Sequence, residues 1–128
     1  FYCSRAALKL MIDAGHGCII NISSRASEVG ADGVSPAYSA TKAGVRGLTK
    51  SFSHQVASKG VRVNAILPSL IISRDFGWSP EMMMERRKDY PLGFGAPRDV
   101  GEAVRYLASP AAKWLSGTEL RVNGGNQR

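Results

Sequence analysis

The sequence predicts an α/β fold in which parallel strands form one sheet with helices packed on its faces. Two observations carry this prediction: short runs rich in Ile and Val, and longer segments with helical spacing of apolar residues, which alternate along the chain. Strands buried on both faces of a sheet are continuous apolar runs, and their alternation with helices is typical of parallel sheets. The 128 residues suffice for a single domain with a modest core.

The first predicted helix covers Tyr2–Ala14, where apolar residues follow a helical period. Gly15 comes next, and glycine commonly ends a helix there because it adopts the left-handed conformation without strain. The run Cys18–Ser23 is apolar and β-branched, which predicts a strand buried on both faces. The polar, glycine-containing stretch Arg25–Ser35 predicts a loop.

The second predicted helix begins at Pro36, whose missing N–H is harmless in a first turn, and runs to about Ser58. One of its faces is predicted to be apolar, through Val45, Leu48, Phe52 and Val56. A neighbouring stripe holds small residues, including Gly44 and Gly47. Because each helical glycine costs about 0.5–1 kcal/mol relative to alanine, the stripe indicates close approach of another backbone. The remaining face is predicted to be exposed to solvent and carries Arg46, Lys50 and His54.

The second predicted strand is Val61–Leu67, and Pro68 ends it. A long irregular stretch follows, and connections longer than about 12–15 residues are usually lids or binding loops. Its three consecutive methionines, Met82–Met84, predict either an adaptable apolar pocket or the buried side of a lid helix. A helix over Asp99–Ser109 and a third strand over Thr118–Val122 complete the predicted order.

The charge balance is 17 basic against 10 acidic residues, or +7. The basic residues are spread along the chain without a recognition-helix pattern or stacking-aromatic motif, so we expect a solvated surface and no nucleic-acid binding. No run approaches the roughly 18 apolar residues of a membrane span, and the two cysteines and two histidines have no metal-ligand spacing. We therefore expect no membrane partner, no metal and a cytoplasmic location. Because the chain opens on Phe1 inside a helical pattern, we expect a piece of a longer protein.

Side chains suited to carbonyl–alcohol redox chemistry gather at one predicted edge of the sheet. Ser24 follows the first strand, and Tyr38 and Lys42 lie one turn apart on the same side of the following helix. The segment Pro68–Ser73 leaves the second strand at the same carboxyl edge, where parallel sheets bind ligands. An ammonium ion beside a phenol favours the phenolate, which makes Tyr38 a candidate acid and base. A tyrosine and a lysine four residues apart are also commonly an ordinary amphipathic pair on a helix, so this spacing alone does not identify a catalytic pair.

These motifs resemble those of the short-chain dehydrogenase/reductase family, in particular its 3-oxoacyl-acyl-carrier-protein reductase-like members. The matching segments are, in chain order, Ile19–Ser24, Ala37–Gly44, Val61–Pro68, Leu107–Ser109 and Gly117–Gly125. The resemblance implies a Rossmann-like, doubly wound fold, of which residues 1–128 would form one partial domain, the C-terminal half. The N-terminal dinucleotide-binding half, with its glycine-rich loop and the asparagine of the proton relay, would be absent.

The resemblance also implies roles for individual residues. Ser24 would hydrogen-bond the substrate oxygen, Tyr38 would exchange a proton with that oxygen, and Lys42 would assist Tyr38 and hold the nicotinamide ribose. The substrate would be a small carbonyl or alcohol compound, and the full-length form a homodimer or homotetramer. The residues expected to contact NAD or NADP are Tyr38, Lys42, Pro68, Ser69, Ile71 through its backbone, and Ser73.

The chain departs from the family pattern in three places. Ser69 replaces a usual glycine, which predicts a strained or shifted turn; Ser73 replaces a threonine; and the interval from Ser24 to Tyr38 is one residue longer. Without the other half, we expect this piece to be weakly stable or to associate, to bind a dinucleotide poorly and to be inactive. An alternative function stays open, that of a non-catalytic, truncated interaction or oligomerisation module.

Overall fold

The computed structural model of this chain describes residues 1–30 and 33–126. The larger helices and the strands agree with the predicted elements to within one or two residues. In chain order the elements are α1 (Tyr2–Ala14), β1 (Gly17–Ile22), α2 (Ala26–Val29), α3 (Pro36–Val56), the short 3-10 helix η1 (Ala57–Lys59), β2 (Val61–Pro68), α4 (Pro80–Arg87), α5 (Pro97–Ala108), a second 3-10 turn η2 (Pro110–Ala112) and β3 (Glu119–Val122).

The three strands form one parallel sheet in the order β1-β2-β3, with β2 in the middle. β1 pairs with β2 from Gly17 opposite Val61 onward, and β3 pairs with the second half of β2, from Ala65 opposite Glu119. Five consecutive residues of β2, from Val63 to Leu67, are completely buried, as the apolar run predicts for a central strand. The α/β class and the parallel sheet are therefore confirmed.

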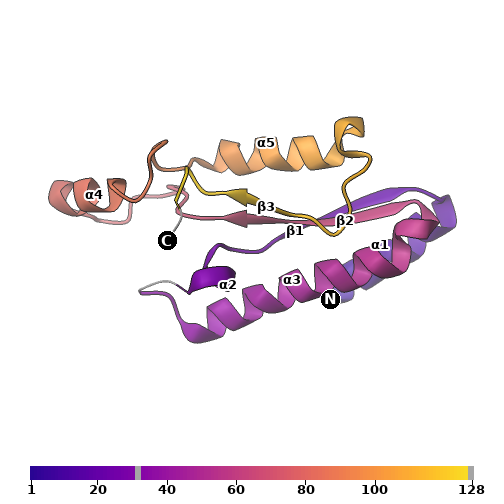
Figure 1. Cartoon of the computed structure of the whole chain (residues 1–128). Coiled ribbons are helices and arrows are strands. Elements are labelled where there is room, and N and C mark those ends of the chain that lie inside the picture. Colours follow the sequence, from indigo (N-terminus) through magenta and orange to yellow (C-terminus); the bar gives the residue numbers. More distant parts are fainter. Residues whose placement is uncertain (31–32, 127–128) are drawn as a thin grey trace.

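Helices cover both faces of the sheet and create two cores. α1 and α3 lie on one face and α5 on the other, while α2 and α4 lie toward the carboxyl ends of the strands (Figure 1). Leu8 of α1 and Val56 of α3 pack with β2 on the first face. On the second face, Leu107 of α5 packs with Ile66 of β2. This arrangement leaves the carboxyl edge of the sheet as the place where loops and short helices meet.

α3 is rotated relative to the prediction. Its fully or nearly buried residues are Thr49, Ser53 and Val56, so the helix presents a largely polar face to the sheet. The hydroxyl of Thr49 accepts a hydrogen bond from the Asn21 side chain at 3.0 Å, and Ser53 bonds Ser116 at 2.7 Å. Because these polar groups find partners on β1 and on the segment that precedes β3, burying them costs little.

Two predictions about the faces of α3 were therefore wrong. Arg46, expected in solvent, is half-buried and donates to Glu119 at 2.8 Å. The small-residue stripe is exposed, and within the described chain no atom lies within 4 Å of a side chain built on Gly44 or Gly47. The close backbone approach that the glycines indicated is thus not made inside the described part of this chain. The remaining small residues of the stripe, also exposed, are Ala37, Ala40 and Ser51.

The predicted loop and lid are more ordered than the sequence indicated. The stretch Arg25–Ser35, predicted as a loop, contains the one-turn helix α2; its residues 31 and 32 lie outside the described residues. The lid contains α4, whose first turn is capped by the hydroxyl of Ser79, which accepts from the N–H of Met82 at 3.2 Å. Met82–Met84 are all exposed, so the prediction that they form the buried side of a lid helix is wrong. Met83 alone lines a small pocket of about 120 Å³ beside Phe76 and Trp78, so the pocket prediction holds for one of the three methionines.

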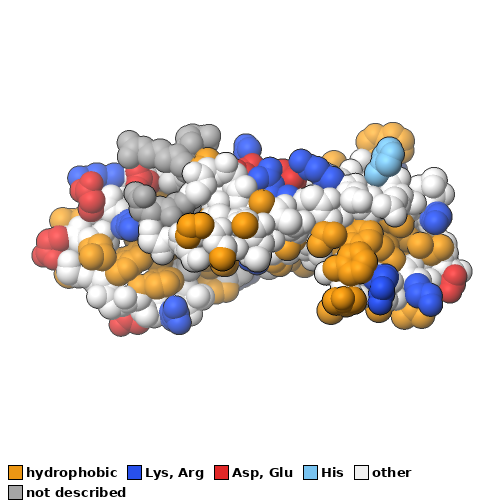
Figure 2. Space-filling view, turned by 90° about the horizontal axis from the view of Figure 1, so that it is seen from below, with side chains coloured by type: hydrophobic (Ala, Val, Ile, Leu, Met, Phe, Trp, Pro, Cys, Tyr) orange, Lys and Arg blue, Asp and Glu red, His pale blue; other side chains and the backbone are white. Residues whose placement is uncertain are grey.

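Apolar side chains gather at one end of the surface that α1 and α3 form (Figure 2). Phe1 and Tyr2 are more than half exposed, and the ring of Phe1 stacks on Phe52 of α3 with centroids 5.9 Å apart. The guanidinium of Arg5 lies over both N-terminal rings. This aromatic patch includes Phe52 of α3, the helix that also carries the exposed small-residue stripe.

We expect Asn64→Leu to lower the free energy of unfolding by about 2–4 kcal/mol, measured by urea denaturation of the longest natural chain that contains this sequence. Asn64 is completely buried; its amide donates to the Leu115 carbonyl at 2.9 Å and its oxygen accepts from the Thr118 N–H at 3.0 Å. Leucine leaves both backbone groups buried and unpaired, at about 1–3 kcal/mol each.

Gln55→Leu is the matched control, because this amide is exposed and bonds only the exposed Ser51 among the described residues. Its effect should stay within about 0.5 kcal/mol. Equal effects of the two substitutions would contradict the assignment of Asn64 as the clamp between β2 and the segment that precedes β3.

Candidate active site at the carboxyl edge of the sheet

Two reciprocal hydrogen bonds fix the start of α3 to the end of β1. The hydroxyl of Ser23 donates to the Lys42 carbonyl at 2.8 Å, and the ammonium of Lys42 donates to the Ile22 carbonyl at 2.9 Å. Ser24 follows β1 directly, and Tyr38 lies one turn before Lys42. The pair of bonds therefore sets the position of the Ser24 segment relative to the first turns of α3.

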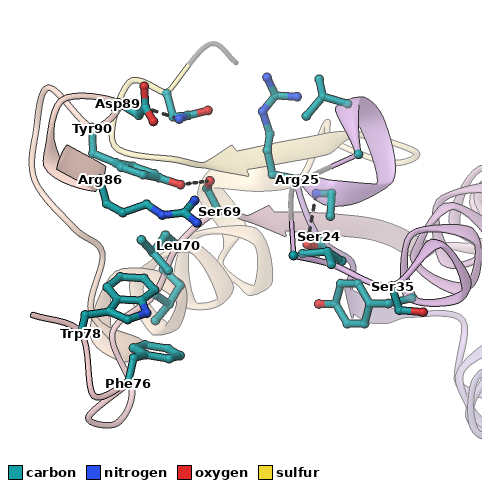
Figure 3. Close-up of a pocket in the computed structure, with 18 of the residues that line it drawn as sticks. Ser24, Arg25, Ser35, Ser69, Leu70, Phe76, Trp78, Arg86, Asp89 and Tyr90 are labelled. Carbon is teal, nitrogen blue, oxygen red and sulfur yellow. Dashed lines mark hydrogen bonds between the residues drawn. The ribbon is translucent and has the colours of Figure 1, made fainter. Parts of the chain in front are cut away.

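A broad cleft of about 1240 Å³ opens at this edge. Ser24 and Tyr38 line it together with Ser69 and Ile71, which follow β2. Figure 3 shows Ser24 and Ser35 on one side of the cleft, with Ser69, Leu70, Trp78 and Arg86 on the other side. The fold thus brings together four of the residues that sequence reasoning selected.

The local geometry suits hydrogen bonding to a ligand oxygen. The Ser24 oxygen accepts from the N–H of Ala26 at 3.2 Å, which leaves the hydroxyl proton available for donation into the cleft. The Tyr38 side chain is 43% exposed, so a ligand can reach its hydroxyl. The ammonium of Lys42 lies 5.7 Å from the centre of the Tyr38 ring, within the range of a cation–π contact. Lys42 itself does not line the cleft, and its ammonium is bonded to the Ile22 carbonyl.

The segment after β2 contributes backbone groups to the cleft. Ile71 forms a bridge with Gly95 through its neighbours: the Ile72 N–H donates to Gly95 at 2.8 Å, and the Gly95 N–H donates to Leu70 at 3.2 Å. This bridge leaves the N–H and carbonyl of Ile71 without a hydrogen-bond partner among the described residues. Free backbone donors and acceptors at this point fit the carboxamide of a nicotinamide cofactor.

Three other predictions for this segment have different outcomes. Pro68 ends β2 and Ser73 is exposed, and neither lines the cleft. Ser69 was predicted to give a strained or shifted turn; no described residue other than glycine has a positive φ, so the strained alternative is wrong. Its N–H donates to Val122 at 3.0 Å and its hydroxyl bonds the Tyr90 hydroxyl at 3.1 Å, which explains how serine fits there.

Sequence reasoning missed a buried arginine next to the candidate serine. Arg25 is 8% exposed, lines the cleft, and donates to Glu28 at 2.8 Å. Its Nε is buried without a hydrogen-bond partner in the described chain. Glu28 also accepts from Arg121 of β3, at 2.8–3.2 Å, and lies 3.6 Å from Arg46 of α3. The only signal in the sequence is that Glu28 follows Arg25 by three residues, directly after Ser24. The same spacing is common for ion pairs on a protein surface, so it does not reveal a buried arginine.

This ion cluster continues to β3. Glu119 accepts from Arg46 at 2.8 Å and lies 3.1 Å from the ammonium of Lys50. Hydrogen bonds from Arg121 and Arg25 hold the pKa of Glu28 below its usual value, and Arg46 and Lys50 do the same for the pKa of Glu119. The cluster therefore joins α2, α3 and β3 around the segment that carries Ser24.

Other kinds of site find little support in the residues that the structure describes. Over residues 1–30 and 33–126, no group of three or more His, Cys, Asp or Glu could hold a metal ion. In the same ranges, no helix combines the length and the apolar character that crossing a membrane requires.

Comparison with known proteins decides the family. A family model described as enoyl-(acyl carrier protein) reductase matches residues 1–127. The chain is 41% identical to the 3-oxoacyl-[acyl-carrier-protein] reductase FabG of Rickettsia prowazekii (strain Madrid E) over 131 residues, which cover 98% of this chain and 52% of that protein. The chain belongs to the short-chain dehydrogenase/reductase family.

Solved structures of short-chain reductases share its fold. A 3-oxoacyl-[acyl-carrier protein] reductase from Brucella melitensis ATCC 23457 matches with a TM-score of 0.89 and 31% identity, over 97% of this chain and 47% of that chain. A reductase of the same name with bound NAD, also from Brucella melitensis, matches with a TM-score of 0.85 and 30% identity, over 97% of this chain and 46% of that chain. The Rossmann-like class is confirmed, and the chain spans about half the length of the relatives that it matches.

We expect the ion cluster around Glu28 to make the stability of this member of the short-chain dehydrogenase/reductase family pH-dependent. Because the folded-state pKa of Glu28 lies below its ordinary value of 4.5, its contribution is complete above about pH 4.5 and is lost as the pH falls through the lowered pKa. Glu28→Gln should lower the free energy of unfolding by about 2–3 kcal/mol at pH 7. It should also flatten the acid side of a plot of this free energy against pH.

Glu102→Gln supplies the comparison. Glu102 pairs with Arg98 and Arg105 on the outer surface of α5 and is 48% exposed, so its loss should cost less than about 0.5 kcal/mol at any pH. An acid limb that is unchanged in Glu28→Gln would contradict the role of the cluster.

Proposed function

We propose that the protein containing this chain is an NAD(P)-dependent oxidoreductase that interconverts a carbonyl and an alcohol by hydride transfer. The observation that carries this proposal is the presence of Ser24 and Tyr38 in one cleft, with the Lys42 ammonium 5.7 Å from the Tyr38 ring. A hydroxyl donor, a phenol and a cation are the groups that acid–base chemistry at a carbonyl oxygen needs. The family membership supports the same reaction class.

Each residue has a separate task in this proposal. The Ser24 hydroxyl donates a hydrogen bond to the substrate oxygen and polarises the carbonyl. Tyr38 gives that oxygen a proton during reduction and takes one during oxidation. Lys42 stabilises the negative charge that forms on the phenol oxygen when the proton leaves, because opposite charges attract strongly near a protein surface. The nicotinamide cofactor supplies or accepts the hydride when bound.

The cofactor would lie against the segment that follows β2. The unpaired N–H and carbonyl of Ile71 support placement of the carboxamide there, with Ser69 bordering the ring. Pro68 and Ser73 do not line the cleft, so no contact with the cofactor is proposed for them. Lys42 and Tyr38 would hold the ribose. Either NAD or NADP is compatible with this set, because the proposed contacts reach only the nicotinamide and its ribose, which the two cofactors share.

We propose that residues 1–128 are the C-terminal half of the enzyme and are inactive alone. The sequence holds no glycine-rich dinucleotide loop, and the chain spans about half of its relatives. We also propose a cytoplasmic enzyme that acts as a homodimer or homotetramer. The exposed aromatic patch of Phe1 and Tyr2 and the small-residue stripe of α3 support association through these helices.

The same exposed helical surface favours one alternative, a non-catalytic module that pairs with other members of the family. Turnover separates the two proposals, because a module needs no acid–base group. An enzyme that is active with its cofactor excludes the module, and absence of hydride transfer in every form would favour it.

We expect Tyr38→Phe to lower kcat for carbonyl reduction by about 10²–10⁴-fold in the longest natural chain, with the Kd of the cofactor nearly unchanged. The substitution removes the proton donor and keeps the ring, so binding should survive. The measurement combines steady-state oxidation of NADH or NADPH with a cofactor titration followed by fluorescence.

Tyr106→Phe is the matched control, since this tyrosine is 44% exposed on α5 and lies outside the cleft. It should retain full activity. A Tyr38→Phe enzyme with activity near that of the control would refute the assignment of Tyr38 as the acid.

A further inference from the structure

The segment between β2 and α5 forms a cationic, aromatic wall of the cleft. Its charged and aromatic lining side chains are Arg74, Phe76, Trp78, Arg86, Asp89 and Tyr90. Figure 3 shows Arg86 extending from this wall toward Ser69 and Leu70, across the cleft from Ser24. The proposed reaction uses none of the lining residues of this wall, so their chemistry needs a separate account.

Aromatic stacking holds both arginines of the wall. The rings of Phe76 and Trp78 stack at 4.9 Å with an interplanar angle of 21°. The guanidinium of Arg86 lies 5.8 Å from the Trp78 ring, and that of Arg74 lies 5.7 Å from the Phe76 ring. A guanidinium that rests on a ring still has N–H donors at its edge for an anionic ligand.

The two arginines have no carboxylate partner among the described residues. Neither Arg74 nor Arg86 forms an ion pair or a side-chain hydrogen bond there, whereas Arg25 is paired with Glu28. Among the charged residues that line the cleft, Arg25 is already paired with Glu28, so Arg74 and Arg86 stand against one acidic residue, Asp89. The cleft therefore keeps an excess of positive charge, which attracts an anion.

We propose that Arg86, held on Trp78, selects carbonyl and alcohol substrates that carry an anionic group. This proposal rests on the oxidoreductase function above and names its substrate class. The anion would contact Arg86 on the lid wall, while the reacting oxygen faces Ser24 and Tyr38 on the other wall. A carboxylate and a phosphate share the chemistry that the guanidinium recognises, because both accept two parallel N–H donors.

The test compares matched charged and neutral probes on the longest natural chain with saturating cofactor. Acetoacetate is paired with methyl acetoacetate, and dihydroxyacetone phosphate with dihydroxyacetone. Dissociation constants are measured by calorimetry in the presence of the oxidised cofactor, which cannot reduce these carbonyl probes. We expect the anionic member of at least one pair to bind more tightly, and the pair that shows the difference identifies a carboxylate or a phosphate.

Substitutions then assign the preference to Arg86. Arg86→Met should weaken binding of the anionic probe by about 10–100-fold and of the neutral probe by less than about 2-fold. Arg86→Lys, which keeps the charge but loses the planar fork, should lose about 3–10-fold. Arg98→Met is the control, because Arg98 is 89% exposed on α5 and outside the cleft, and it should change neither constant.

Three results would overturn the proposal. They are equal binding of charged and neutral probes by the unsubstituted protein, an equal loss for both probes in Arg86→Met, and a loss confined to the Kd of the cofactor. These readouts do not depend on turnover. Failure of the proposed reaction would therefore appear as a missing effect of Tyr38→Phe on kcat, with the charge preference intact.

Discussion

The reciprocal hydrogen bonds between the end of β1 and the start of α3 are the constraint on which the candidate site depends. Ser23 and Lys42 each donate to a backbone carbonyl of the other segment, at 2.8 and 2.9 Å. The end of β1 and the start of α3 are separated along the chain by α2 and a connecting stretch, so their relative position depends on contacts between residues distant in sequence. The ammonium group of Lys42 thus has two roles: it bonds the backbone of β1, and it lies within cation–π range of the Tyr38 ring.

A second set of interactions holds the other side of the site. Glu28 and Glu119 connect α2, α3 and β3 through Arg25, Arg46 and Arg121. The members of this cluster are mostly shielded from solvent, so their mutual attraction is stronger than that of exposed pairs. Charge in this fold therefore serves two purposes: paired arginines near Ser24 hold the framework, and the unpaired arginines of the lid face the cleft.

Local patterns were sufficient for the elements and for part of the site. Apolar runs predicted β1 and β2, and Gly15 and Pro36 marked the ends of helices correctly. The rule that ligands bind at the carboxyl edge of a parallel sheet placed Ser24 beside Tyr38, and both line the cleft. The faces of α3 were not predictable, because the hydroxyls of Thr49 and Ser53 bond Asn21 and Ser116, which are distant in sequence.

The order of helices and strands, the parallel sheet and the family motifs followed from the residues alone, because each depends on neighbours a few positions away. Long-range contacts settled the rest: the burial of Arg25, the pairing of Glu28 with β3, the exposure of the methionines and the stacking of Arg86 on Trp78. These features depend on which charged or aromatic group meets which across the folded chain. Composition and periodicity do not encode that information, since the same side chain is stable either in solvent or against a partner.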